Sequence, residues 1–247
     1  MEIGTTTISR EIERAVAALD VDAIEKAYWD QDEFVFIPRF LDPEAIGPLI
    51  QDVERLTPRL NRNYVPRHKK GGSVSHFLIA EDGPALLEFY RSSAFRQFLS
   101  RLTKSDLKLC PNDDPHACAL YFYTEDGDHM GYHYDTSYYK GARYTVLFGL
   151  VQESSSRLLC RLHTRQKGRE AKDLSVLTTP GSMVIFNGDK VYHGVTPSRE
   201  GDRRVVLTME YVTSQEMGRA KRIFSNLKDA FAYFGVKSLW QARRRSK

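Results

Sequence analysis

The feature that most constrains the fold is a series of short β-prone segments that begins near residue 107. The segments read LKLC, CALYFY, RYTVLFGLV, RLLCRL, LSVLT, SMVIFNG, KVYHGV and RRVVLTMEYV. Turn-rich pieces such as PNDDP, TTPG and PSREGD separate them, with no helical pattern in between. Short strands at close spacing without intervening helices indicate an antiparallel sandwich or barrel.

Helical periodicity flanks this β-rich part on both sides. It appears in four segments, namely 8–28, 41–56, 83–102 and 215–245, the second of which has Asp42 as a predicted N-cap and Pro43 in the first turn. EFVFIP (33–38) predicts a short strand, and the basic, glycine-containing stretch 61–77 predicts a loop. We therefore expect one domain, with a helical lead-in over about 1–105, a β core over about 106–213 and C-terminal helices over about 214–247.

Composition excludes several classes of protein. Three cysteines without a C-x-x-C pair argue against a disulfide scaffold and for a reducing compartment. Neither a signal peptide nor an apolar run long enough to cross a bilayer is visible, so we expect a cytoplasmic protein with no membrane partner. The net charge of +4 is mild. Its excess lies in 61–70 and 242–247, which favours a solvated loop and tail over nucleic-acid contact.

The residues most suggestive of chemistry are two histidines and an aspartate. In GYHYDTSYY, His133 and Asp135 lie two positions apart, so in an extended segment both side chains point to the same face. His193 follows in KVYHGVTP, and strands of one barrel can bring it close. Two imidazoles and one carboxylate on one side of a metal form the facial triad of non-haem Fe(II) oxygenases.

An arginine at a suitable offset strengthens the metal hypothesis. Arg203 lies ten residues after His193, beyond the turn-rich TPSREGD. A hairpin there would place Arg203 beside His193, where its guanidinium could bind the far carboxylate of a dicarboxylic keto acid. Arg204 is adjacent, and a register shift of one residue would exchange the two roles.

These motifs together resemble the Fe(II)/2-oxoglutarate-dependent dioxygenase superfamily. The similarity runs from Tyr121 to Tyr211 and rests on H-x-D, the distal H-G-V and the G-x-R that ends at Arg203. It implies a double-stranded β-helix (jelly-roll, cupin-like) core with flanking helices, hence an α+β fold. It also implies Fe(II) as cofactor, 2-oxoglutarate and O2 as co-substrates, and a possible contact of Tyr121 or Tyr123 with 2-oxoglutarate.

A looser similarity concerns CPNDDPHACALYFYTEDGDHMGYHYD, which resembles small superfamily members that act on free amino acids, including lysine halogenases. In those proteins a carboxylate after the Cys-Pro pair approaches the substrate amine, a role that would fall here to Asp113 or Asp114. Asp residues are also common in such turns because they cap backbone groups. The halogenases replace the metal carboxylate by Gly. This chain keeps Asp135, so the similarity implies hydroxylation or desaturation.

The sequence therefore predicts an Fe(II)/2-oxoglutarate-dependent oxygenase that hydroxylates or desaturates a small metabolite, an amino acid or amine being the expected type. One alternative is the same chemistry on a nucleic acid or a protein side chain, suggested by the basic segments. The other is a non-catalytic, cupin-like binding module, whose closed metal shell would need a fourth protein ligand, and none is evident.

Overall fold

The computed structural model describes residues 7–135 and 137–217. Its helices are α1 (Thr7–Ala18), α2 (Val21–Asp30), α3 (Gly47–Leu56), the 3-10 helix Thr57–Arg59, α4 (His76–Asp82), α5 (Pro84–Arg91) and α6 (Ser93–Thr103). The strands are β1 (Phe34–Ile37), β2 (Asn61–Val65), β3 (Lys69–Val74), β4 (Lys108–Leu109), β5 (Cys118–Tyr123), β6 (His129–His133), β7 (Arg143–Glu153), β8 (Leu158–Leu162), β9 (Lys172–Val176), β10 (Met183–Asn187), β11 (Tyr192–Val195) and β12 (Arg203–Val212).

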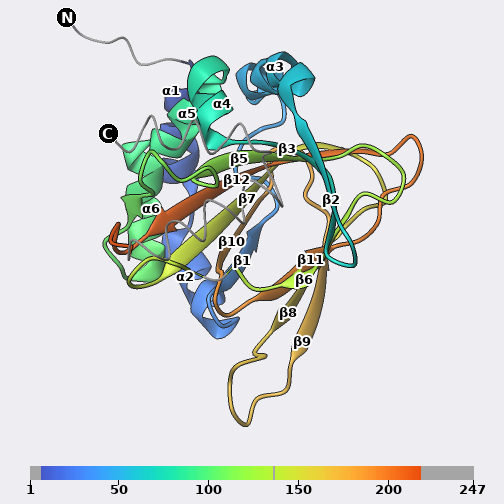
Figure 1. The fold of residues 1–247 in the computed structure, drawn as a ribbon. Coiled ribbons are helices and arrows are strands. Elements are labelled where there is room, and N and C mark those ends of the chain that lie inside the picture. Colours follow the sequence, from blue (N-terminus) through green and yellow to red (C-terminus); the bar gives the residue numbers. More distant parts are fainter. Residues whose placement is uncertain (1–6, 136, 218–247) are drawn as a thin grey trace, which may run out of the picture.

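The strands of the described residues form one curled antiparallel sheet. Its order is β1-β10-β7-β12-β5-β3-β6-β11-β8-β9, with β2 added beside β3 and β4 beside β12. The long strands β7 and β12 form the centre of the broad half, and β6, β11, β8 and β9 form the half that lies away from the helices (Figure 1). This arrangement confirms the predicted jelly-roll core with flanking helices.

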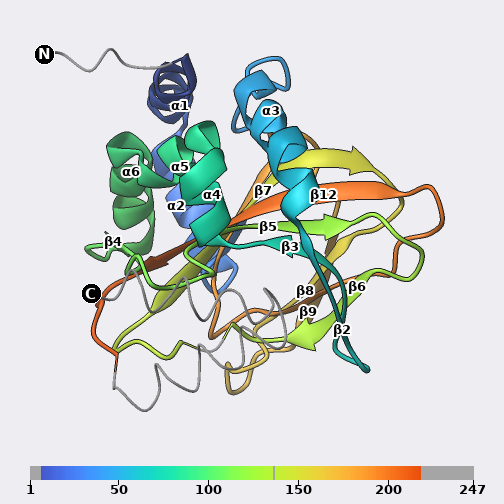
Figure 2. The same cartoon turned by 45° about the horizontal axis from the view of Figure 1, so that its top comes forward.

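The helices gather on one side of the broad half of the sheet (Figures 1 and 2). They bury one apolar cluster against it, in which the ring of Phe89 from α5 meets Phe148 of β7 edge-on at 5.0 Å between ring centroids. A second apolar cluster fills the inside of the curled sheet and includes Leu147, Leu158 and Val206. The helical layer therefore supports the sheet from outside. The part of the interior that the second cluster does not occupy is open for a site between the two halves of the sheet.

The boundaries of two predicted helices differ from those observed. Helix α3 begins at Gly47 with Pro48 in its first turn, because the Asp42 carboxylate accepts the Glu44 N–H (3.0 Å) and caps a preceding turn instead. The predicted helix 83–102 is two helices, separated where Ser92 adopts non-helical angles and accepts the Phe95 N–H. The helices expected over 8–28 and the strand over 33–38 are confirmed.

The prediction of a loop over 61–77 is wrong. Strands β2 and β3 form a hairpin there, and β3 also pairs with β5 and β6. Gly71 and Gly72 allow this close pairing, since a side chain at either position would contact the backbone oxygen or Cβ of Phe122 at 3.1–3.2 Å. Most of the helical segment predicted over 215–245 lies outside the described residues. Among the described residues, no helix is long and apolar enough to cross a membrane.

Candidate active site

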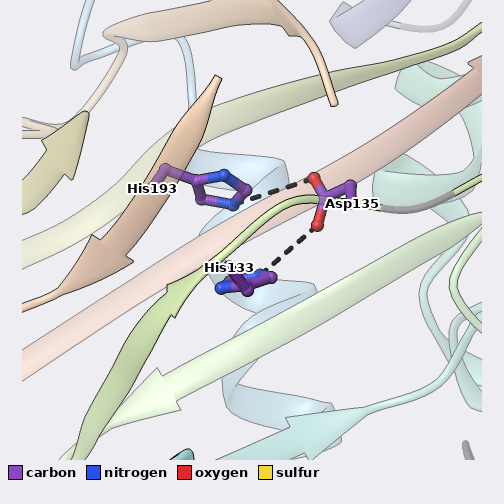
Figure 3. Close-up of side chains that lie close together, drawn as sticks. All are labelled: His133, Asp135 and His193. Atoms are coloured by element: carbon purple, nitrogen blue, oxygen red, sulfur yellow. Dashed lines mark ion pairs between the residues drawn. The ribbon is translucent and has the colours of Figure 1, made fainter. Parts of the chain in front are cut away.

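Three potential metal ligands meet on the inner face of the curled sheet. His133 ends β6, Asp135 follows two residues later, and β11 places His193 directly opposite His133. Figure 3 shows both imidazoles facing the Asp135 carboxylate, with His133 Nε2 3.3 Å from Oδ1 and His193 Nε2 3.7 Å from Oδ2. One donor atom from each residue lies within 4.8 Å of the others. The structure thus brings together the three residues that the motif singled out.

The backbone orients both imidazoles for metal binding. His133 Nδ1 lies 2.9 Å from the Gly131 carbonyl oxygen, and His193 Nδ1 lies 3.2 Å from that of Val191. Because a carbonyl can only accept, each Nδ1 carries the proton and each Nε2 keeps its lone pair. A hydrogen bond from the ring nitrogen that does not bind the metal fixes both the tautomer and the ring orientation of a metal-binding histidine. Both Nε2 lone pairs therefore point toward Asp135, as a shared metal ion would require.

The charges of the triad also suit a divalent cation. Burial alone would raise the pKa of the Asp135 carboxyl, but His193, His133 and Arg143 outweigh it and hold this pKa well below its ordinary value. Burial lowers the pKa of His193 to about 4, partly offset by Asp135. At neutral pH the carboxylate is therefore ionised and His193 is neutral, which are the protonation states that a metal ion requires.

The arginine that faces the cavity is Arg204, not Arg203. Arg203 is exposed and lies outside the cavity lining, whereas Arg204 is fully buried and lines it. The expected hairpin between β11 and β12 does not form: β12 lies between β7 and β5, away from β11. The offset from His193 therefore could not decide which arginine points inward. We carry the predicted role in 2-oxoglutarate binding over to Arg204.

The surroundings of Arg204 suit an incoming carboxylate. Its Nη2 donates to Thr178 Oγ1 (3.1 Å), and its guanidinium lies 4.9 Å from the ring centroid of Tyr123. Among the described residues, Nε and Nη1 have no hydrogen-bond partner and no carboxylate pairs with the group. Burial lowers the pKa of this guanidinium, in keeping with a charge that lacks a counter-ion. Buried charges in proteins are ordinarily paired, so this one is a strong candidate for an anion site.

The two predicted tyrosines both line the cavity. Tyr123 is buried beneath Arg204, and Tyr121 lies one β-pleat further along β5 with its hydroxyl 2.9 Å from His116 Nδ1. Since residues two apart on a strand share a face, β5 presents both rings to the same space. Tyr123 is the one next to the proposed carboxylate site, so we assign the predicted co-substrate contact to it first.

The two predicted substrate aspartates lie outside the cavity lining. Asp113 and Asp114 are both buried in the segment before β5. The Asp114 carboxylate accepts the His116 N–H (2.8 Å) and the Tyr139 hydroxyl (2.6 Å). The first of these bonds closes an Asx turn, the capping role weighed against substrate contact from the sequence. A role in binding an amine stays a prediction for this pair.

Other cavity residues were missed by the sequence reasoning. Arg143 and Thr145 of β7 and Glu210 of β12 line a cavity of about 110 Å³ together with the triad and Arg204. Arg143 Nε donates to Glu210 Oε2 (2.9 Å), and burial raises the pKa of Glu210 to about 7 against the opposing effect of Arg143. A glutamate inside the apolar run VVLTMEYV was the available signal, because a charged residue in a buried strand rarely lacks a specific reason.

Comparison with known proteins agrees with this geometry. A family model described as halogenase D matches residues 20–142, just under half of the chain. No curated protein sequence matches the chain. The non-haem α-ketoglutarate-dependent epimerase SnoN from nogalamycin biosynthesis superimposes with a TM-score of 0.67 at 13% identity, covering 83% of this chain and 86% of that one. A prolyl hydroxylase from Trichoplax adhaerens gives 0.63 at 16% identity, covering 90% and 98%.

A prolyl-4-hydroxylase from Pseudomonas putida gives a TM-score of 0.55 at 14% identity, covering 79% of this chain and all of that one. The fold is therefore the jelly roll of the Fe(II)/2-oxoglutarate oxygenases, and the resemblance inferred from the motifs is confirmed at this level. The halogenase model includes His133 and Asp135 but ends before His193.

Proposed function

We propose that this chain is an Fe(II)- and 2-oxoglutarate-dependent dioxygenase that oxidises a small molecule by hydroxylation or desaturation. The observation that carries the proposal is one cavity that holds a His–Asp–His triad and a buried arginine with no counter-ion among the described residues. The triad occupies one side of a metal and leaves positions open, as a metal that must bind two co-substrates requires. The solved structures of similar fold include one described as a complex with Fe3+ and α-ketoglutarate, which supports this choice of cofactors.

The residues have separate roles in this proposal. His133, Asp135 and His193 would hold Fe(II), and Arg204 with the ring of Tyr123 would bind the distal carboxylate of 2-oxoglutarate. The bound iron supplies the activation of O2 that couples the conversion of 2-oxoglutarate to succinate and carbon dioxide with oxidation of the substrate. The protein orients both co-substrates and excludes water with the apolar side chains around them.

The substrate is proposed to be a small metabolite, with an amino acid or amine as the first class to test. The cavity has a volume of about 110 Å³, and the named functions of similar folds include a carbocyclase and an epimerase of nogalamycin biosynthesis. The expected contact with the ammonium group of such a substrate was assigned to Asp113 or Asp114, neither of which lines the cavity. The acidic side chain besides Asp135 that does so among the described residues is Glu210.

The basic segment 61–70 gives little support to a nucleic-acid substrate. Arg62 pairs with Asp128 (2.6 Å) and Glu125 (2.8 Å), and Lys69 is buried. Lys70 donates to the Asp126 carbonyl. Arg62 and Lys70 hold the β2–β3 hairpin onto the sheet, and Lys69 is withdrawn from solvent, whereas contact with a phosphate backbone needs exposed charges. Arg67 is the exposed cation of this segment. The second basic segment, 242–247, lies outside the described residues.

The proposal is tested by metal-dependent release of succinate from 2-oxoglutarate, with a panel of amino acids and amines as candidate substrates. His133→Ala, Asp135→Ala and His193→Ala should each abolish Fe(II)-dependent succinate formation and weaken Mn(II) binding, with the fold retained by circular dichroism. His129→Ala is the matched control, because its Nδ1 lies 2.8 Å from the Gly127 carbonyl and it does not line the cavity that holds the triad. Full activity in any triad variant would contradict the assignment. No succinate from the wild-type protein under any condition would favour a binding module.

A further inference from the structure

One hydroxyl group lies between the metal-site carboxylate and a second carboxylate. Thr145 Oγ1 is 2.8 Å from Asp135 Oδ2 and 3.0 Å from Glu210 Oε2, and the Thr145 residue is 1% exposed. Both contacts are within hydrogen-bonding distance, and the site is shielded from bulk water. The hydroxyl therefore connects Asp135 to the central strands of the sheet.

The strand register holds this hydroxyl in place. Thr145 of β7 lies directly opposite Glu210 of β12, and Arg143 precedes Thr145 by two residues on the same face. Arg143 Nε donates to the same Glu210 oxygen that contacts Thr145, and both charged side chains are almost fully buried. A buried ion pair of this kind contributes little net stability. A hydroxyl carries one hydrogen, so Thr145 donates to one carboxylate at a time. The donation from Arg143 Nε to Glu210 Oε2 satisfies that oxygen and favours donation of the Thr145 hydrogen to Asp135 Oδ2.

Asp135 needs such support because it lies just beyond the end of β6. Its backbone N–H donates to the Gly188 carbonyl (3.0 Å), which holds the main chain. A Cβ on Gly188 would lie 2.6 Å from the Asp135 Cβ, so the absence of a side chain there is what lets Asp135 approach. Neither contact fixes rotation of the carboxylate about its Cβ–Cγ bond, a torsion with broad preferences. The Thr145 hydroxyl, 2.8 Å from Oδ2, is placed to restrict this rotation.

We propose that Thr145, held by the Glu210–Arg143 pair, is the positioning residue of the metal-binding carboxylate. By binding Oδ2 it sets the plane of the Asp135 carboxylate relative to the two imidazole Nε2 atoms. The Gly131 and Val191 carbonyls perform the equivalent task for the histidines. This inference rests on the proposed function only in taking the triad as a metal site, and it has Thr145 act through Asp135.

The test measures metal binding rather than turnover. Metal-free protein is titrated calorimetrically with Mn(II), without 2-oxoglutarate, and the visible spectrum of the Co(II) form reports ligand geometry. Thr145→Val keeps the shape and the branched Cβ but removes the hydroxyl, and it should weaken Mn(II) binding about 10- to 100-fold, the usual range for an outer contact of a metal ligand. Thr145→Ser restores the hydroxyl and should stay within about threefold of wild type. Thr145→Ala also removes the hydroxyl but leaves a smaller side chain, and it replaces Thr145→Val in the test if that variant disturbs the fold.

Thr208→Val is the matched control, since Thr208 of β12 also lines the cavity but lies opposite Leu147 in the strand register, away from Thr145. Its Mn(II) affinity and Co(II) spectrum should equal those of wild type. Wild-type-like Mn(II) affinity in Thr145→Val and Thr145→Ala, or equal losses in Thr145→Val and Thr208→Val, would overturn the positioning role alone. If the wild-type protein bound neither metal, the proposed function would fail together with this inference.

Discussion

Replacement of Arg204 provides the sharpest test of the co-substrate site. The structure turns Arg204 into the cavity and leaves Arg203 exposed on the outside of β12. Arg204→Ala should therefore impair 2-oxoglutarate binding strongly, and Arg203→Ala is a matched control one residue away on the same strand. Arg204→Lys keeps the charge but loses the planar pair of donors, so it should fall between wild type and Arg204→Ala.

The expected magnitude follows from the burial of Arg204 and its free donors. Loss of a desolvated, charge-assisted pair costs about 2–5 kcal/mol. That range corresponds to an increase in the dissociation constant of about 30-fold to several thousand-fold. Arg203→Ala should change it by less than about twofold. Because Arg204 has no counter-ion among the described residues, its replacement by Met should leave the melting temperature of the ligand-free protein unchanged or raise it.

The assay is anaerobic calorimetric titration of 2-oxoglutarate into the Fe(II)- or Mn(II)-loaded variants, with succinate release as a second readout. Melting temperatures without ligand separate lost binding from lost fold. A larger effect for Arg203→Ala than for Arg204→Ala would refute the orientation of β12 described above. Equal, small effects would show that the distal carboxylate is bound elsewhere. A drop in the ligand-free melting temperature of Arg204→Met would contradict the conclusion that the buried charge is uncompensated.

Three further predictions concern stability and the aspartates. Burial lowers the pKa of Lys69 to about 7, so between about pH 7 and 10.5 this residue binds a proton in the unfolded chain that it does not bind in the folded one. The Lys69 contribution to the unfolding free energy should therefore rise with pH across this window by at most about 4–5 kcal/mol. It is measured as the difference between wild type and Lys69→Met in urea titrations at each pH. Gly188→Ala should displace Asp135 and weaken Mn(II) binding at least about tenfold, whereas Gly47→Ala, with free space around it, should not. Asp114→Asn weakens a turn, so it should lower the melting temperature by a few degrees. The ratio of oxidised product to succinate, measured with an amine that the enzyme accepts as substrate, will fall only if Asp114 also binds that substrate.

Local patterns in the sequence determined the outline of the protein. The alternation and spacing of strand segments predicted an antiparallel core, and H-x-D predicted two side chains on one face, because a strand alternates its side chains with a period of two. The later H-G-V motif supplied His193. These inferences depend on residues within one or two strands, so they need no knowledge of how strands are arranged. They led to an antiparallel sandwich or barrel and to a triad that the structure brings together, and the resemblance to a known superfamily specified the jelly roll.

Only the tertiary structure decided the remaining features, because they depend on which strands are neighbours. The offset between His193 and Arg203 assumed a hairpin, but β12 pairs with β7 and β5, and this pairing turns Arg204 inward. The polar stretch 61–77 became strands because β3 could add to the sheet between β5 and β6. The link from Asp135 through Thr145 to Glu210 joins three strands, and its geometry depends on a register that neighbouring residues in the sequence do not reveal.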